Sequence, residues 1–230
     1  MDIATFETLD RQLLEFFNGS NSVFLDSVAI TFTSGLTWIP LYVALLYLVI
    51  KNSENMAQFG LIVGSVLLCM LLSDGVAEYL VKPYVGRLRP SADPAVKYLI
   101  DVVGNYREST TFSFPSAHAA NTAAVAVFFS LLVRNKSLSV MLLLWSVLNC
   151  WTRLYLGVHY PGDILVGFLW GIISAVVSYG AYRAIYFRLR PRLNYISSQY
   201  TSTGYNHEDI DIVLLTGVLL CLYVVLRAVF

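Results

Sequence analysis

Residues 57–81 read AQFGLIVGSVLLCMLLSDGVAEYLV, and this stretch decides the fold class. A helix needs about 20 apolar residues to cross the hydrocarbon core of a bilayer, and Ala57 to Val81 comes close to that requirement. Five further stretches do the same: Ser27 to Ile50, Ser116 to Val133, Leu138 to Val158, Asp163 to Ile185 and Asp211 to Phe230. The sequence therefore predicts an all-α integral membrane bundle of about six transmembrane helices.

Composition supports a membrane protein. Of the 230 residues, 57% are hydrophobic and only 13% are charged, against about 25% charged in soluble domains. Fifteen basic residues balance fifteen acidic ones, so the net charge gives no indication of nucleic-acid binding. The three cysteines are far apart, and no Cys/His spacing indicates a metal. We expect the lipid bilayer as partner, with no cofactor and no obligatory protein partner.

The regions outside the apolar stretches have distinct compositions. The first 22 residues predict an amphipathic helix at the membrane interface, with one apolar side formed by Phe6, Leu9, Leu13, Phe16 and Phe17. Residues 82–114 contain three prolines and predict broken helix and loop. We expect a single membrane domain over 1–230, with its core at 57–185, a cytoplasmic linker at 186–209 and a final span at 211–230.

Three short motifs carry the residues suited to chemistry. The first is KPYVGRLRP, residues 82–90, in which Lys82 and Arg89 are seven positions apart. If the segment is helical, this spacing is about two turns, so both cations can reach one anion. The alternative is a basic cluster that extends to lipid headgroups.

The second motif is PSAH, residues 115–118, at the start of an apolar stretch. Pro115 is typical of a helix start and Ser116 of an N-cap, so the free N–H groups of Ser116, Ala117 and His118 would point out of the membrane. Helix N-termini bind phosphate, and the imidazole adds a general acid. The alternative is an ordinary capped helix with an interfacial histidine.

The third motif is TRLYLGVHYPGD, residues 152–163. Asp163 is four residues after His159, so its carboxylate can accept the Nδ1–H and leave Nε2 free as a nucleophile. Arg153 adds a cation at the end of the preceding stretch. The alternative is a charge pair that only caps a helix.

Loop charges indicate the orientation in the membrane. Basic residues gather between alternate apolar stretches, namely Lys51, Arg134, Lys136, Arg183, Arg188, Arg190 and Arg192. By the positive-inside rule these segments are cytoplasmic, which puts all three motifs on the opposite side. We expect a bacterial inner (cytoplasmic) membrane protein whose motifs face the periplasm.

Together the motifs resemble the tripartite signature of the type 2 phosphatidic acid phosphatase superfamily, in order and spacing. Ala117 stands where that signature has Gly, and Thr152 where it has Ser. The resemblance implies that His159 attacks phosphorus to form a phosphohistidine, that Asp163 orients it and that His118 protonates the leaving oxygen. It also implies that no metal is needed. The implied phosphate-binding residues are Lys82, Arg89, Ser116, Ala117 and Arg153.

Four more charged residues lie before, within or after the first motif. Carboxylates within a span are costly and usually functional or paired, which applies to Asp74 and Glu78. Because Glu78 is four residues before Lys82, we expect it to hold that lysine in place; contact with the substrate is the alternative. Arg87 and Lys97 either extend the basic surface toward a second phosphate or belong to a solvated loop.

We therefore expect a membrane lipid phosphatase that acts on a lipid phosphate or diphosphate. A polyprenyl diphosphate, phosphatidylglycerophosphate or phosphatidic acid is favoured as substrate, and lipid A phosphates share the same chemistry. One alternative is a lipid phosphotransferase with the same phosphohistidine. A non-catalytic lipid-binding or transport protein is the other.

Overall fold

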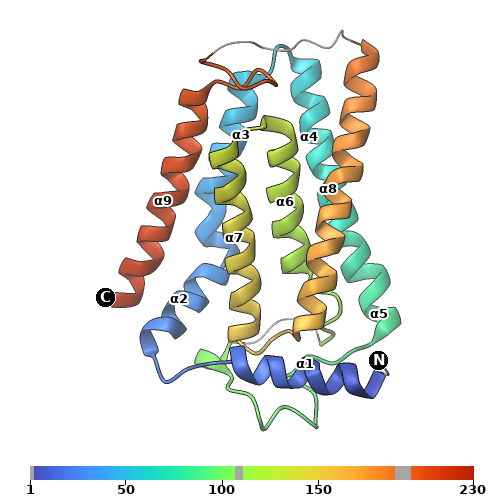
Figure 1. Ribbon diagram of the computed structural model, residues 1–230, viewed down its shortest axis with the longest axis vertical. Coiled ribbons are helices and arrows are strands. Elements are labelled where there is room, and N and C mark those ends of the chain that lie inside the picture. The colour runs from blue at the N-terminus through green and yellow to red at the C-terminus, as the bar shows by residue number, and fades with distance from the viewer. Residues whose placement is uncertain (1–2, 107–110, 190–197) are drawn as a thin grey trace.

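The computed structural model describes residues 3–106, 111–189 and 198–230. Arg190 and Arg192, which we assign to the cytoplasmic side, lie outside these ranges. The described parts form an all-α bundle, as predicted. Its long helices run side by side, and α1 (Ile3–Phe17) lies across one end of them (Figure 1).

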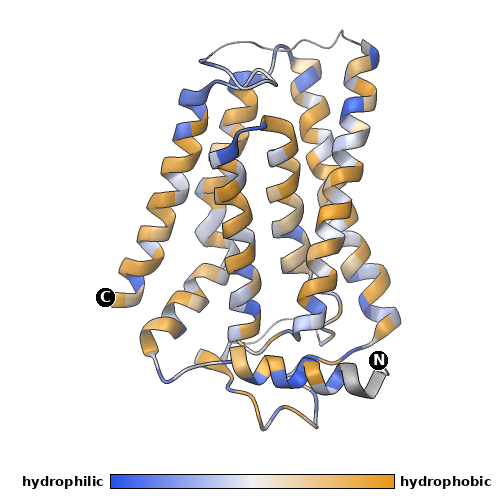
Figure 2. Ribbon diagram, in the orientation of Figure 1, coloured by the Kyte–Doolittle hydropathy of each residue, from blue (hydrophilic) through white to orange (hydrophobic). Residues whose placement is uncertain are grey.

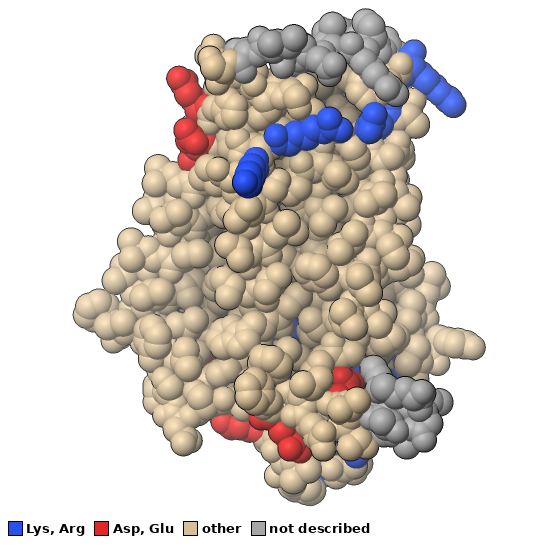
Figure 3. Space-filling model, viewed as in Figure 1, with Lys and Arg blue, Asp and Glu red and all other residues tan. Residues whose placement is uncertain are grey.

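Five helical stretches are long and apolar enough to span a membrane among the described residues: Gly35–Asn52, Met56–Val85, Lys136–Tyr155, Pro161–Arg188 and His207–Val229. Hydrophobic residues dominate the helix bodies and hydrophilic residues gather toward the two ends (Figure 2). On the face drawn in Figure 3, charged side chains are also concentrated near the ends, leaving a largely uncharged belt between them. This pattern is that of a helical membrane protein.

The prediction of one helix from Ser27 to Ile50 is wrong. It is divided into α2 (Val23–Thr33), the short 3₁₀ turn η1 (Gly35–Trp38) and α3 (Ile39–Asn52). Ser34 is extended at the break, where the Trp38 Nε1–H donates to the Phe32 carbonyl at 2.7 Å. Pro40 in the first turn of α3 restarts the helix.

Residues 57–81 form one continuous helical stretch, as predicted, and this stretch continues beyond both of the predicted ends. It comprises α4 (Met56–Met70), the π-helical segment η2 (Leu71–Val81) and α5 (Lys82–Val85). Gly86 ends it with a positive φ of 62°, a conformation that glycine adopts without strain. The helix therefore delivers Lys82 to the end of the bundle.

The shortest of the predicted spans forms the centre of the bundle. It is α6 (Ala117–Val133), which packs against α7 (Lys136–Tyr155) and α8 (Pro161–Leu189). A side chain at Gly167 or Gly171 of α8 would collide with the Ser116 or Ala120 carbonyl. These two glycines therefore let the start of α6 lie directly against α8. The last helix, α9 (His207–Val229), packs on α2 and α3.

Candidate active site

The three motifs meet at one end of the bundle. Lys82 begins α5, PSAH leads into α6, and the third motif covers the end of α7, the following turn and the start of α8. The α6–α7 turn lies at the other end (Figure 1). The motifs therefore share one end of the molecule, as the alternation of apolar stretches predicts.

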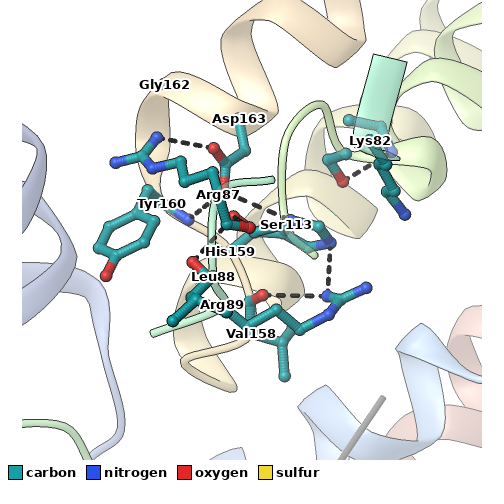
Figure 4. Close-up of polar contacts among 12 residues, drawn as sticks. Lys82, Arg87, Leu88, Arg89, Ser113, Val158, His159, Tyr160, Gly162 and Asp163 are labelled. Atoms are coloured by element: carbon teal, nitrogen blue, oxygen red, sulfur yellow. Dashed lines mark hydrogen bonds and ion pairs between the residues drawn. The ribbon is translucent and has the colours of Figure 1, made fainter. Parts of the chain in front are cut away.

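His159 lies in the turn before α8 and is almost fully buried (Figure 4). Its Nδ1 faces the Asp163 Oδ2 at 3.6 Å, an ion-pair distance longer than a hydrogen bond. Nδ1 has no hydrogen-bond partner among the described residues. The Asp163 Oδ2 also accepts the Tyr160 backbone N–H at 2.9 Å, which folds the turn so that imidazole and carboxylate point at each other.

Arg89 determines which nitrogen of His159 carries the proton. Its Nη1 lies 3.0 Å from the His159 Nε2 and 3.1 Å from the Val158 carbonyl (Figure 4). Because a guanidinium can only donate, Nε2 is the acceptor and the proton of the neutral ring is on Nδ1, facing Asp163. Nε2 therefore keeps the lone pair that a nucleophile needs.

The surroundings keep His159 neutral. Burial lowers its pKa well below the ordinary value of 6.5, and nearby positive charges lower it further. In order of effect these charges belong to Arg89, Arg153, Lys82 and His118. At neutral pH the imidazole is therefore unprotonated at Nε2.

The other predicted cations lie around this ring, each with an internal partner. Lys82 is buried and forms an ion pair with Glu78, as we expect for a supporting carboxylate. Arg153 is fully buried, and its Nη1 donates to the Thr33 Oγ1 at 2.7 Å and to the Tyr106 hydroxyl at 3.2 Å. Thr33 lines the cavity and Arg153 does not, so Arg153 acts on the site through its positive charge.

The start of α6 differs in one respect from the prediction. The Ser116 N–H is not free, because it donates to the Asp163 carbonyl at 3.0 Å. The Ser116 Oγ caps the helix by accepting the Ala119 N–H at 3.4 Å. The fold uses that N–H to join α6 to α8, and of this motif Ala117 and His118 line a cavity beside His159.

A cavity of about 660 Å³ opens beside His159, within the range of small-molecule sites. Seven predicted residues line it: Asp74, Glu78, Lys82, Arg89, Ala117, His118 and His159. The other three predicted site residues, Ser116, Arg153 and Asp163, do not line the cavity and are fully buried. The lining also includes Thr33, Gly35, Trp38, Tyr42, Trp145 and Asn149.

Some residues that form the site lie outside the three motifs. Asn121, on α6, lines the cavity and donates to the Asp74 Oδ1 at 2.8 Å. Thr33 and Tyr106, which hold Arg153, belong to segments with no motif.

Arg87 is in neither of its two predicted environments, because its guanidinium bridges Asp163 and Asp10. Lys97 is exposed, with its Nζ 4.7 Å from the centroid of the Tyr98 ring.

Fold and geometry define an integral membrane protein with a buried, neutral histidine and several cations around one cavity at an end of its bundle. The family model described as the PAP2 superfamily matches residues 62–187, and the chain belongs to that superfamily. It is thus a membrane lipid phosphatase, as the resemblance of its motifs implies.

Two curated relatives are similar over most of their length. The chain is 40% identical to the lipid A 4'-phosphatase of Bacteroides thetaiotaomicron over 71% of this chain and 72% of that protein. It is 33% identical to the lipid A 4'-phosphatase of Porphyromonas gingivalis over 76% and 73%. Among solved structures, Aquifex aeolicus LpxE matches with a TM-score of 0.55 and 22% identity, covering 74% of this chain and 93% of that one. This last likeness concerns the fold.

Proposed function

We propose that this phosphatase removes a phosphate monoester from the sugar headgroup of a lipid A-type glycolipid at the periplasmic membrane surface, through a phosphohistidine on His159. The observation that carries the mechanism is the position of the imidazole, with its Nε2 beside Arg89 at 3.0 Å and its Nδ1 facing Asp163. The names of the two curated relatives support the substrate class. They do not support our leading expectation of a polyprenyl diphosphate or a phosphoglyceride.

The proposed reaction has two steps. The Nε2 of His159 attacks phosphorus, the P–O bond to the headgroup breaks, and His118 gives its proton to the leaving oxygen. Water then attacks the same phosphorus, passing a proton to His118 as the P–N bond breaks. The Asp163 carboxylate faces the Nδ1–H and stabilises the positive charge that develops on the ring, and Lys82 and Arg89 neutralise charge on the phosphoryl oxygens.

The lining of the cavity supports a sugar as the leaving group. Three aromatic residues line the cavity together, with the Trp145 ring centroid 5.6 Å from that of Trp38 and 6.2 Å from that of Tyr42. Asp74 and Asn121 add a hydrogen-bonded polar pair to the same lining. A few polar groups set among aromatic ones are what a pyranose ring needs, because its faces are apolar and its edges carry hydroxyls.

Orientation is proposed from the ends of the bundle. Lys51 is in the last turn of α3, and Lys136 begins α7, both at the end away from the site. The site end would then face the periplasm. There the phosphate of a glycolipid anchored in the outer leaflet can reach the cavity.

A substrate panel tests the proposal. We expect the purified protein in detergent to release phosphate from a 4'-phosphorylated diglucosamine lipid with a kcat/KM at least about tenfold above that for phosphatidylglycerophosphate or a polyprenyl diphosphate, a margin of about 1.4 kcal/mol. A preference for either of the other lipids would refute the substrate class. Adding a second lipid alcohol separates hydrolysis from phosphotransfer, because transfer gives a phosphorylated acceptor in place of free phosphate.

A further inference from the structure

Arg87 joins two buried carboxylates from distant parts of the chain. Its Nη1 donates to the Asp163 Oδ1 at 2.7 Å (Figure 4), and its Nη2 donates to the Asp10 Oδ2 at 2.6 Å. The side chain of Asp10 is 3% exposed and that of Asp163 fully buried. The guanidinium also lies 3.9 Å above the centroid of the Tyr160 ring. Both ends of its fork are therefore occupied by charge-assisted hydrogen bonds.

Asp10 makes a second contact on the same turn. Its Oδ1 accepts the Gly162 N–H at 2.7 Å, and Gly162 immediately precedes Asp163. One carboxylate of α1 thus binds the backbone beside Asp163 directly and the Asp163 side chain through Arg87. This arrangement fixes the start of α8 from outside the bundle.

The rest of α1 is firmly attached at the same place. Leu14 is fully buried in a cluster with Val96, Ile100 and Tyr160. Asn18, just after the helix, donates to the Asp101 carbonyl at 3.0 Å and accepts the Asp101 N–H at 2.6 Å. The contact between Asp10 and the turn is therefore supported by packing and hydrogen bonds of the part of the chain that follows Asp10.

The opposite side of α1 is apolar and exposed. Leu9 is 43%, Leu13 48% and Phe16 81% exposed. This side fits the predicted interfacial helix. Asp10 and Leu14 instead face the bundle, so α1 has one surface for lipid and another for the site.

We propose that Arg87 and Asp10 are positioning residues for the Asp163 carboxylate, which makes α1 part of the catalytic apparatus; this inference rests on the proposed role of His159. Arg87 occupies Oδ1, and the Tyr160 N–H together with His159 faces Oδ2. The carboxylate is thus held at two points and cannot turn away from the imidazole. Without Arg87, a buried carboxylate oxygen loses its charged partner, and the carboxylate is expected to rotate.

The test uses conservative substitutions and a matched control. Asp10→Asn and Arg87→Lys keep the approximate shape of each side chain but remove the charge or the two-pronged geometry. In each variant kcat is expected to fall by about 10- to 100-fold, because a small misplacement at a reacting centre costs about that much. KM for the lipid phosphate stays within about twofold, since neither side chain lines the cavity. The double variant is expected to lose no more than Arg87→Lys alone, because both residues act through Asp163.

Arg11→Gln is the control. Arg11 is the next residue on α1, and its contact is with Asp93 at 3.9 Å, away from Asp163. We expect this variant to keep the wild-type kcat, and the thermal midpoint of each variant is measured so that kcat is compared on folded protein. Wild-type kcat in both Asp10→Asn and Arg87→Lys would overturn the inference, as would a loss confined to KM. If His159→Ala itself retained activity, the proposed function would fail too, so the two failures are distinguishable.

Discussion

His159→Ala is expected to abolish phosphate release, with a loss of about 10⁴-fold or more in kcat. The reason is that the proposed reaction uses the Nε2 of His159 as its nucleophile, and this nitrogen lies 3.0 Å from the Arg89 Nη1 in the cavity wall. The measurement is phosphate release from a lipid phosphate in detergent, with protein concentration and folded state matched between the variant and the wild type.

The matched control for this variant is His207→Ala. His207 begins α9, and its Nδ1 lies 3.3 Å from the Asn135 side chain at the end of the bundle away from the site. This control is expected to keep wild-type activity. Comparable rates in His159→Ala and the wild type would remove the basis of the mechanism.

His118→Ala is expected to lower kcat on a lipid phosphate by about 10²- to 10⁴-fold. His118 lies in the first turn of α6 and lines the cavity with His159, so we assign it both proton transfers. An aryl phosphate with a good leaving group does not need the first of these. In this variant one equivalent of aryl alcohol is therefore expected in a rapid burst, followed by slow turnover because water is no longer activated.

Burst kinetics distinguish this role from a structural one. A misfolded site would lose the burst together with turnover, whereas loss of the acid and base alone would preserve it. A wild-type kcat on the lipid phosphate in His118→Ala would assign the proton transfers to another group. Lys82→Met serves as a comparison, because it weakens anion binding and is expected to raise KM for both substrates.

Much of the fold follows from the sequence because the bilayer imposes a simple requirement of length and hydropathy. The stretch from Ala57 to Val81 is helical throughout for this reason. The break inside Ser27 to Ile50 is harder to predict. It contains Gly35 and Pro40, but glycine and proline also occur in continuous membrane helices. It depends on contacts such as that of Trp38 with the Phe32 carbonyl, which stabilise the turn only once it has formed.

The site is divided in the same way between local and distant contacts. The approach of His159 to Asp163 is a four-residue spacing within one turn, and the sequence predicts it. The contact of Arg89 with His159 spans 70 positions, and that of Arg87 with Asp10 spans 77. From sequence alone, Arg87 resembles a solvated residue of a proline-containing loop. Its buried role appears only in the fold, where α1 brings Asp10 to its guanidinium.

Capture of the phosphoenzyme tests the central proposal most directly. Because His118→Ala is expected to stall after the first step, this variant is mixed with a phosphate-labelled aryl phosphate, quenched in alkali and digested. We expect close to one label per protein on the peptide that contains His159, and none in the His118→Ala, His159→Ala double variant. A burst of aryl alcohol without label on that peptide, or equal labelling of the double variant, would contradict a phosphohistidine at His159.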